Sequence, residues 1–124
     1  MQNDKLKFKK AFKERLYCFV LKLIKLIENL PKDQTSKILS EQLLRSGTSI
    51  LSNYIEGQSA SSKKDFTNYF QHSLKSINES KVWLALLRDT KKIQKDETEL
   101  FLEELKELGN IFGSSILTLK GKKY

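Results

Sequence analysis

The residues whose types and spacing are suited to chemistry lie in the middle of the chain. Four polar side chains recur there at steps of three or four residues, a spacing that places them on one stripe of a helix. They are Arg45, Ser49, Asn53 and Glu56, and the following segment adds Asp65, Ser76 and Glu79. Carboxylates on different helical turns do not by themselves form a general acid–base pair. The stripe is therefore consistent with an interhelical hydrogen-bond network, a subunit contact or a binding groove.

The motifs of the common enzyme classes are missing from the sequence. His72, the one histidine, has neither Asp nor Glu three or four residues away, so a carboxylate-bridged di-iron site lacks its ligands. The chain contains no glycine-rich phosphate loop, no G-x-S-x-G and no Cys/His nucleophile pair. Cys18 lies within an apolar run, which predicts a buried, inert thiol. We therefore expect no catalytic residue, metal or cofactor, and predict that the protein is not an enzyme.

Composition and periodicity predict the elements that position these residues. Glycine (5) and proline (1) are scarce among 124 residues, which disfavours the many tight turns of an all-β fold. Apolar residues recur at steps of three and four, and they predict helices over residues 6–30, 34–58, 63–90 and 97–120. Short connections make sequential helices antiparallel. The sequence therefore predicts one all-α domain over residues 1–124, an antiparallel up-down-up-down four-helix bundle.

Several residues mark where these helices begin, end and approach one another. Pro31 stops the first helix, and Asp33, Ser62 and Asp96 stand where N-cap acceptors are expected. Gly47 costs about 1 kcal/mol relative to alanine inside a helix, so it indicates close approach of a neighbouring helix. The inward stripe of the first helix is predicted to contain Phe8, Phe12, Leu16, Phe19, Val20, Leu23, Ile27 and Leu30.

The net charge of +8 is concentrated in two of the four segments. Residues 1–32 hold nine Lys or Arg against three acids, and residues 61–92 hold seven against three. The first and third helices lie on a diagonal of such a bundle, so their charge need not merge on one face of a monomer, although it can merge in an oligomer. Such a chain attracts polyanions in a salt-dependent way, but a solvated lysine-rich surface explains the charge equally well. The candidate phosphate contacts are Lys5, Lys7, Lys9, Lys10, Lys13, Lys63 and Lys64.

The central stretch, residues 42–87, resembles the four-helix bundle family named for open reading frames in intervening sequences of bacterial 23S ribosomal RNA genes. Its most specific part is "SILSNYIEG", residues 49–57, and "ENLPKD" at residues 28–33 fits the usual break after the first helix. The loop that follows lacks the arginine often found there, and Lys63 and Lys64 supply the charge instead. The matching positions are Gln42, Leu43, Arg45, Ser46, Ser49, Ile50, Asn53, Glu56, Gly57, Asp65, Phe66, Ser76 and Glu79.

The resemblance implies a ring of five subunits without enzymatic activity. It also implies similarity to the accessory variability protein of diversity-generating retroelements, a basic pentamer that resembles a docking platform for a reverse transcriptase and its RNA. The leading hypothesis is thus a non-catalytic homo-oligomeric adaptor that binds RNA, or else DNA, through lysine–phosphate contacts that carry no sequence information. The alternative is a protein–protein scaffold with an apolar outer patch, for which the candidates are Tyr17, Tyr54, Tyr69 and Trp83.

The first helical segment also bears on location. Lys22 and Lys25 interrupt its apolar run, so it matches neither a signal peptide nor a membrane span. We therefore expect a cytoplasmic protein with no membrane partner.

Overall fold

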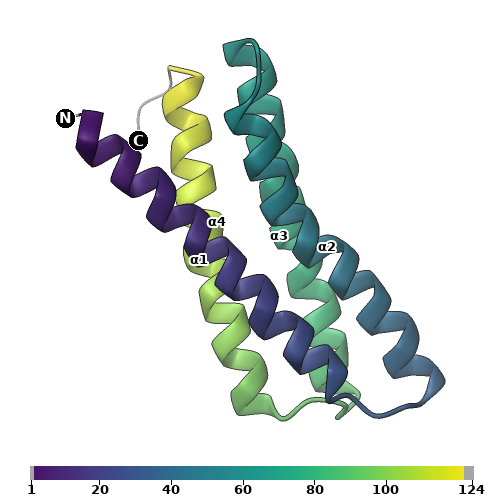
Figure 1. Cartoon of the computed structure of the whole chain (residues 1–124). Coiled ribbons are helices and arrows are strands. Elements are labelled where there is room, and N and C mark those ends of the chain that lie inside the picture. The colour runs from purple at the N-terminus through teal and green to yellow at the C-terminus, as the bar shows by residue number, and fades with distance from the viewer. Residues whose placement is uncertain (1, 122–124) are drawn as a thin grey trace.

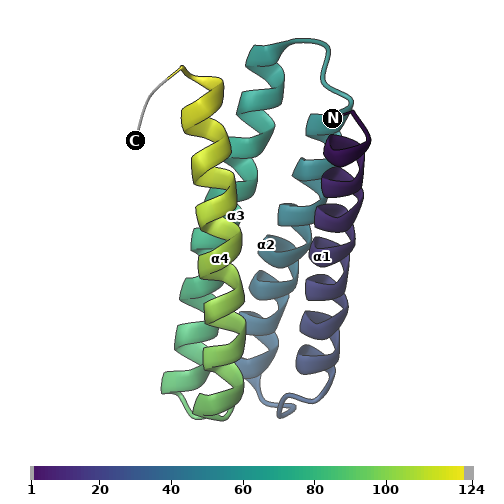
Figure 2. The same cartoon turned by 90° about the vertical axis from the view of Figure 1, so that its left-hand side faces the viewer.

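Four antiparallel helices make up the protein in a computed structural model that describes residues 2–121 (Figure 1). They are α1 (Gln2–Glu28), α2 (Gln34–Gln58), α3 (Lys63–Asp89) and α4 (Lys95–Leu119). Each helix packs against the next along the chain, and α1 and α3 lie on one diagonal (Figures 1 and 2). This arrangement confirms the predicted all-α antiparallel four-helix bundle. None of these four helices is both long enough and apolar enough to span a bilayer.

The ends of α1 differ most from the prediction. The helix begins at Gln2 instead of residue 6, with Asp4 in its first turn, where a negative charge favours helix formation. It ends at Glu28, two residues earlier than predicted, because Pro31 disfavours helical geometry at Leu30. The amides of Asn29 and Leu30 instead donate to carbonyls three residues back, at 3.1 and 3.2 Å, which tightens the last turn.

The predicted caps of α2 and α3 are both present. The side chain of Asp33 accepts a hydrogen bond from the amide of Ser36 at 2.9 Å. Ser62 accepts in the same way from the amide of Asp65 at 3.1 Å. Each side chain satisfies an amide that has no partner within its own helix.

The predicted cap of α4 is wrong. The helix begins at Lys95, two residues before the predicted start, and Asp96 lies inside its first turn instead of capping it. Gln94 occupies the cap position without a side-chain hydrogen bond. The reason is packing: the buried side chain of Ile93 fixes the position of the turn, and the buried hydroxyl of Thr98 donates to the carbonyl of Gln94 at 2.9 Å. At the other end α3 and α4 each stop one residue earlier than predicted.

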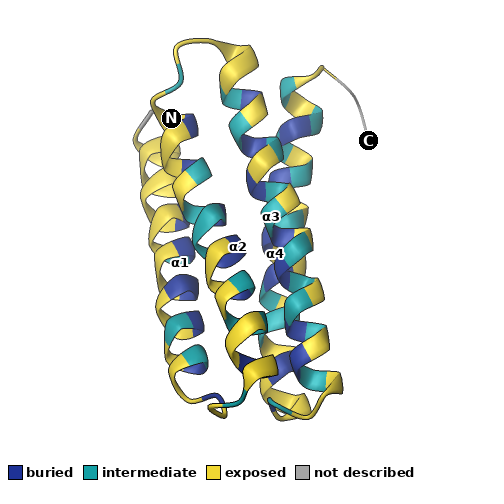
Figure 3. Ribbon diagram, turned by 90° about the vertical axis from the view of Figure 1, so that its right-hand side faces the viewer, coloured by how far each residue is buried: buried dark blue, intermediate teal, exposed yellow. Residues whose placement is uncertain are grey.

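The core fills the centre of the bundle but stops short of the end where α1 begins, since residues 3–11 are all exposed (Figure 3). At the end where α1 and α3 begin it is aromatic. Phe112 of α4 contacts Phe12, Tyr54 and Phe70 from the other three helices, with ring centroids 5.4, 6.1 and 5.2 Å away. The remaining core is mainly aliphatic and includes Leu16, Leu23, Leu43, Ile50, Ile77, Leu84, Leu87, Leu105 and Leu108. Ile27, predicted inward, is half-buried, and Leu26 is buried as well.

Two apolar side chains of α1 are not where the sequence places them. Phe8 is 59% exposed because it lies one turn beyond Phe12, where no neighbouring helix covers it. Cys18 is exposed and not buried. The run around Cys18 contains six consecutive apolar residues, and a helix can bury only those that face the core, so Tyr17 and Leu21 turn outward with it.

Small residues bring α2 and α3 close together. The buried hydroxyls of Ser46 and Ser80 lie 2.7 Å apart across the two helices. The hydroxyl of Ser73 donates to the carbonyl of Ile50 at 3.0 Å. The serines therefore combine close packing with satisfied hydrogen bonds.

Gly47 brings α2 close to α1, as its sequence position indicates. A Cβ atom at Gly47 would overlap the Cδ2 methyl of Leu23, which is fully buried.

The contact between α1 and α4 is made by long side chains only. No Cα atom of α1 lies within 8 Å of a Cα atom of α4. Phe19 and Phe101 cross the gap with ring centroids 5.9 Å apart. Arg15 donates two hydrogen bonds to the carboxylate of Glu104, at 2.6 and 2.9 Å, and one to Glu107 at 3.2 Å.

The Arg15–Glu104 pair makes stability depend on pH. Hydrogen bonding from Arg15 holds the pKa of Glu104 in the folded protein below its usual value. The ion pair therefore stabilises the fold fully above about pH 4.3, the pKa of an unperturbed glutamate. This stabilisation is lost as the pH falls through the lower pKa of the folded state. Both groups contact water, and we expect Glu104→Gln to lower the free energy of unfolding at pH 7 by about 1 kcal/mol or less. Urea unfolding at pH 7 and pH 3 measures this effect, which should shrink at pH 3. Glu103→Gln, an exposed acid on the same helix, is the control, and an equal effect of Glu104→Gln at both pH values contradicts the assignment.

Candidate functional site

The basic segments of α1 and α3 lie at the same end of the bundle (Figures 1 and 2). Both helices run in the same direction, so both begin there, and α4 ends there. All the lysines that sequence reasoning singled out in these segments are exposed. With Lys120, the exposed residue that follows α4, they form what we call the basic end: Lys5, Lys7, Lys9, Lys10, Lys13, Lys63, Lys64 and Lys120.

Lys120 was missed as a site residue in the sequence. It lines a shallow pocket of about 400 Å³ together with Lys63 and Lys64. More than fifty residues separate Lys120 from those two along the chain, and only the bundle topology brings them together. The sequence therefore contains no local signal for this contact.

The charge of the basic end is not neutralised within the protein. Among residues 2–121, no lysine of this set forms a salt bridge or a side-chain hydrogen bond. Asp4, Glu56 and Asp65 are the acidic residues nearest this end along their helices. The diagonal placement of α1 and α3 is as predicted, and the lysines near the beginning of each helix lie at the same end of the bundle. This end therefore presents an unpaired positive surface.

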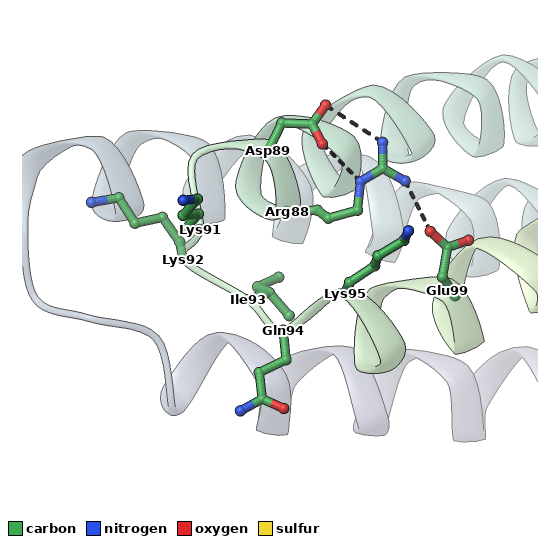
Figure 4. Close-up of a pocket in the computed structure, with 8 residues that line it drawn as sticks. All are labelled: Arg88, Asp89, Lys91, Lys92, Ile93, Gln94, Lys95 and Glu99. Carbon is green, nitrogen blue, oxygen red and sulfur yellow. Dashed lines mark hydrogen bonds and ion pairs between the residues drawn. The ribbon is translucent and has the colours of Figure 1, made fainter.

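The opposite end of the bundle is also rich in cations, and two of them, Arg88 and Lys92, form ion pairs. Figure 4 shows the α3–α4 turn, where a pocket of about 860 Å³ is lined by Arg88, Lys91, Lys92 and Lys95. Arg88 donates to Asp89 at 2.9 Å and to Glu99 at 3.1 Å (Figure 4). The hydrogen bond from Arg88 lowers the pKa of Asp89.

Lys92, at the same turn, lies 3.4 Å from the Asp33 carboxylate. The hydrogen bond from the Ser36 amide, supported by Lys92, lowers the pKa of Asp33. Arg88 and Lys92 thus join α3 to α4 and to the start of α2, whereas the lysines of the basic end make no such contact within residues 2–121.

The central polar stripe divides into parts. Near the middle of α2, Arg45 forms an ion pair with Glu79 of α3 and donates to Gln42 at 2.9 Å. The indole of Trp83 donates to the same Glu79 carboxylate at 3.2 Å. Further along α2, Asn53 donates to the carbonyl of Ser49 at 2.8 Å. These contacts support a hydrogen-bond network for this half of the stripe.

The other half of the stripe lies around the α2–α3 loop. Glu56 and Asp65 line a polar pocket of about 480 Å³ that also includes Tyr69 and His72. The two carboxylates form no ion pair with another residue of the described chain. Ser76 is half-buried, and its carbonyl accepts from the Ser80 hydroxyl at 2.9 Å. The seven residues of the stripe therefore do not share one groove.

The predicted outer patch of aromatic residues is largely absent. Tyr54 is only 3% exposed and belongs to the core, where burial raises the pKa of its phenol. Tyr69 and Trp83 are half-buried. Only Tyr17 is well exposed, at 56%. The interpretation of Tyr54 as an outer residue is wrong, because its ring fits between Phe12 and Phe70.

Comparisons with known proteins agree on one family. The profile of the 23S rRNA-intervening sequence protein family matches residues 9–114. A crystal structure from Bacteroides thetaiotaomicron VPI-5482, of a protein with unknown function from the S23 ribosomal protein family, is 34% identical in sequence. It superposes with a TM-score of 0.79 over 84% of this chain and 96% of that one. No curated protein matches the sequence.

Proposed function

Because the chain belongs to the 23S rRNA-intervening sequence protein family, we propose that it is a non-catalytic, homo-oligomeric adaptor that binds RNA or DNA through the phosphate backbone. The observation that carries the proposal is the basic end, where lysines from α1, α3 and the end of α4 remain unpaired. Lysine ammonium groups neutralise phosphates and release their counterions, which supplies affinity without reading the base sequence. Binding of this kind requires neither a metal nor a cofactor.

An oligomer would strengthen such binding. A cyclic ring, of five subunits by resemblance, repeats the same surface around its axis, and if the bundles stand along that axis every subunit contributes its basic end to one rim. Several weak contacts on one polyanion then act together, and the overall affinity exceeds that of a single subunit.

The proposal predicts a position-dependent effect of removing lysines. Changing Lys5, Lys7, Lys9 and Lys10 together to Gln is expected to weaken binding of an unstructured 20-nucleotide RNA by more than about tenfold at about 0.1 M salt. It should also lower the slope of log affinity against log salt by about 3, because each lost phosphate contact removes about 0.7–0.9 from that slope. Fluorescence anisotropy over a salt series measures both quantities.

The opposite end supplies a matched control with the same change in net charge. Lys32, Lys37, Lys91 and Lys95 are exposed lysines without ion pairs, and their joint change to Gln should alter affinity by no more than about threefold. Equal losses in the two quadruple variants would mean that overall charge, and not the basic end, governs binding. Light scattering coupled to size-exclusion chromatography gives the subunit number with and without RNA.

A second candidate function, a protein–protein scaffold, is favoured by the outward-facing Tyr17 and Leu21 of α1. Tyrosine is enriched at interface cores. Two measurements distinguish the scaffold from the adaptor. The scaffold is supported, and the adaptor contradicted, by two results together. The mass of the protein in light scattering does not change when RNA is added at any salt concentration, and one protein partner is retained after nuclease treatment.

A further inference from the structure

Phe8 lies exposed in the middle of the α1 part of the basic end. More than half of its side chain, 59%, is in contact with solvent. Its ring lies parallel to that of Phe12, with an interplanar angle of 7° and centroids 5.9 Å apart. Phe12 is buried and contacts both Tyr54 and Phe112. Phe8 is thus the outermost ring of the aromatic cluster, supported from inside and open to water.

An exposed aromatic ring among unpaired lysines matches the chemistry of nucleic-acid surfaces that hold single strands. Lys5 lies one helical turn before Phe8 on the same side of α1, and Lys9 directly follows it. Long, flexible side chains at these positions can reach the phosphates on either side of a base that rests on the ring. Stacking on an aromatic side chain contributes about five- to 150-fold in affinity per base and tolerates any base.

We propose that Phe8 is a stacking platform for an unpaired base, so that the basic end binds single-stranded RNA or DNA in preference to duplex. The inference rests on the proposed function, because the lysines must first attract the strand. Bases in a duplex are paired and stacked on one another, and their faces are closed to a side chain. Lysines alone favour the duplex, whose phosphates are more densely spaced, whereas stacking on the ring of Phe8 favours the unpaired strand.

Leu6 provides a matched comparison at the same end. It is 62% exposed, also apolar, and two residues from Phe8, which places it about 200° away around the helix. It has no aromatic face. A contribution from exposed apolar surface in general would make the two residues equivalent, whereas stacking makes only Phe8 matter.

The test compares Phe8→Leu, Phe8→Trp and Leu6→Ala on an unstructured 20-nucleotide uridine strand and on a 20-base-pair RNA duplex. Phe8→Leu is expected to weaken single-strand binding by about fivefold or more and to leave duplex binding within about twofold. Phe8→Trp should retain or increase single-strand affinity, because a larger ring stacks as well or better. Leu6→Ala should change neither affinity by more than about twofold.

Three results overturn the inference, and they differ in what they leave intact. If Phe8→Leu binds both ligands as the wild type does while the quadruple lysine variant does not, stacking is excluded and the adaptor function stands. If the wild type retains neither ligand at low salt, both proposals fail. If Phe8→Leu changes the mass of the nucleic-acid-free protein in light scattering, Phe8 is a subunit contact and not a base platform.

Discussion

Replacing Phe112 with alanine is expected to lower the free energy of unfolding by about 3–5 kcal/mol, the usual cost of removing a large aromatic ring from a core. Phe112 is fully buried, and its ring contacts one aromatic residue from each of the other three helices. The substitution leaves a cavity at a point where side chains of all four helices meet. Total stability of a domain of this size is about 5–15 kcal/mol, so the loss is a large part of the whole.

Urea unfolding followed by far-ultraviolet circular dichroism measures this loss, with all variants at one protein concentration because assembly adds to apparent stability. Phe112→Leu keeps most of the volume and should cost clearly less than Phe112→Ala. Phe101→Ala removes a partly buried ring from the α1–α4 gap and should also cost less. A loss below about 1 kcal/mol for Phe112→Ala would mean that the aromatic cluster is not packed as described.

Gly47→Val is expected to destabilise the protein by about 3 kcal/mol, although valine has the better helix propensity. A Cβ atom at this position overlaps the Cδ2 methyl of Leu23, and Leu23 is fully buried, so its side chain must shift within the packed core. The branched carbon of valine enlarges the overlap, and either the Leu23 side chain leaves its rotamer or α1 moves away from α2.

A double-mutant cycle isolates the cause. Leu23→Ala removes the methyl that valine meets, so Gly47→Val should cost at least about 1 kcal/mol less in that background. Gly113→Ala is the control, since nothing lies within 4 Å of a Cβ atom there, and it should stabilise the protein by about 0.5–1 kcal/mol. Additive effects of Gly47→Val and Leu23→Ala would contradict direct contact between the two positions.

Periodicity was sufficient to predict the four helices and their antiparallel order. It failed for Phe8, because a repeat of apolar residues states which side of a helix faces inward and not which turns a neighbour covers. It also gives no sign that Ser80 is fully buried, because serine is not one of the apolar residues that form the repeat. A serine can occupy the core when a partner such as Ser46 satisfies its hydroxyl, and that partner is 34 residues away.

The candidate site was predictable in its residue types but not in its arrangement. Counting charges along the chain identified the lysines of α1 and α3. These lysines lie at one end because the first and third helices of an up-down-up-down bundle run in the same direction and begin at the same end. In this chain both helices carry lysines near their first turns. The pairing of Arg88 and Lys92 with acids at the opposite end depends on side-chain geometry, which the sequence does not encode locally.

Because the helices are unevenly spaced, we expect them to detach from the bundle at different free energies. The α2–α3 pair is joined by serines at close range, whereas α1 approaches α4 only through long side chains. Amide hydrogens of α1 should therefore exchange with solvent by partial detachment, at a lower free energy than those of α2 and α3. A ligand held by lysines of both α1 and α3 would fasten the most loosely attached helix to the most firmly held pair.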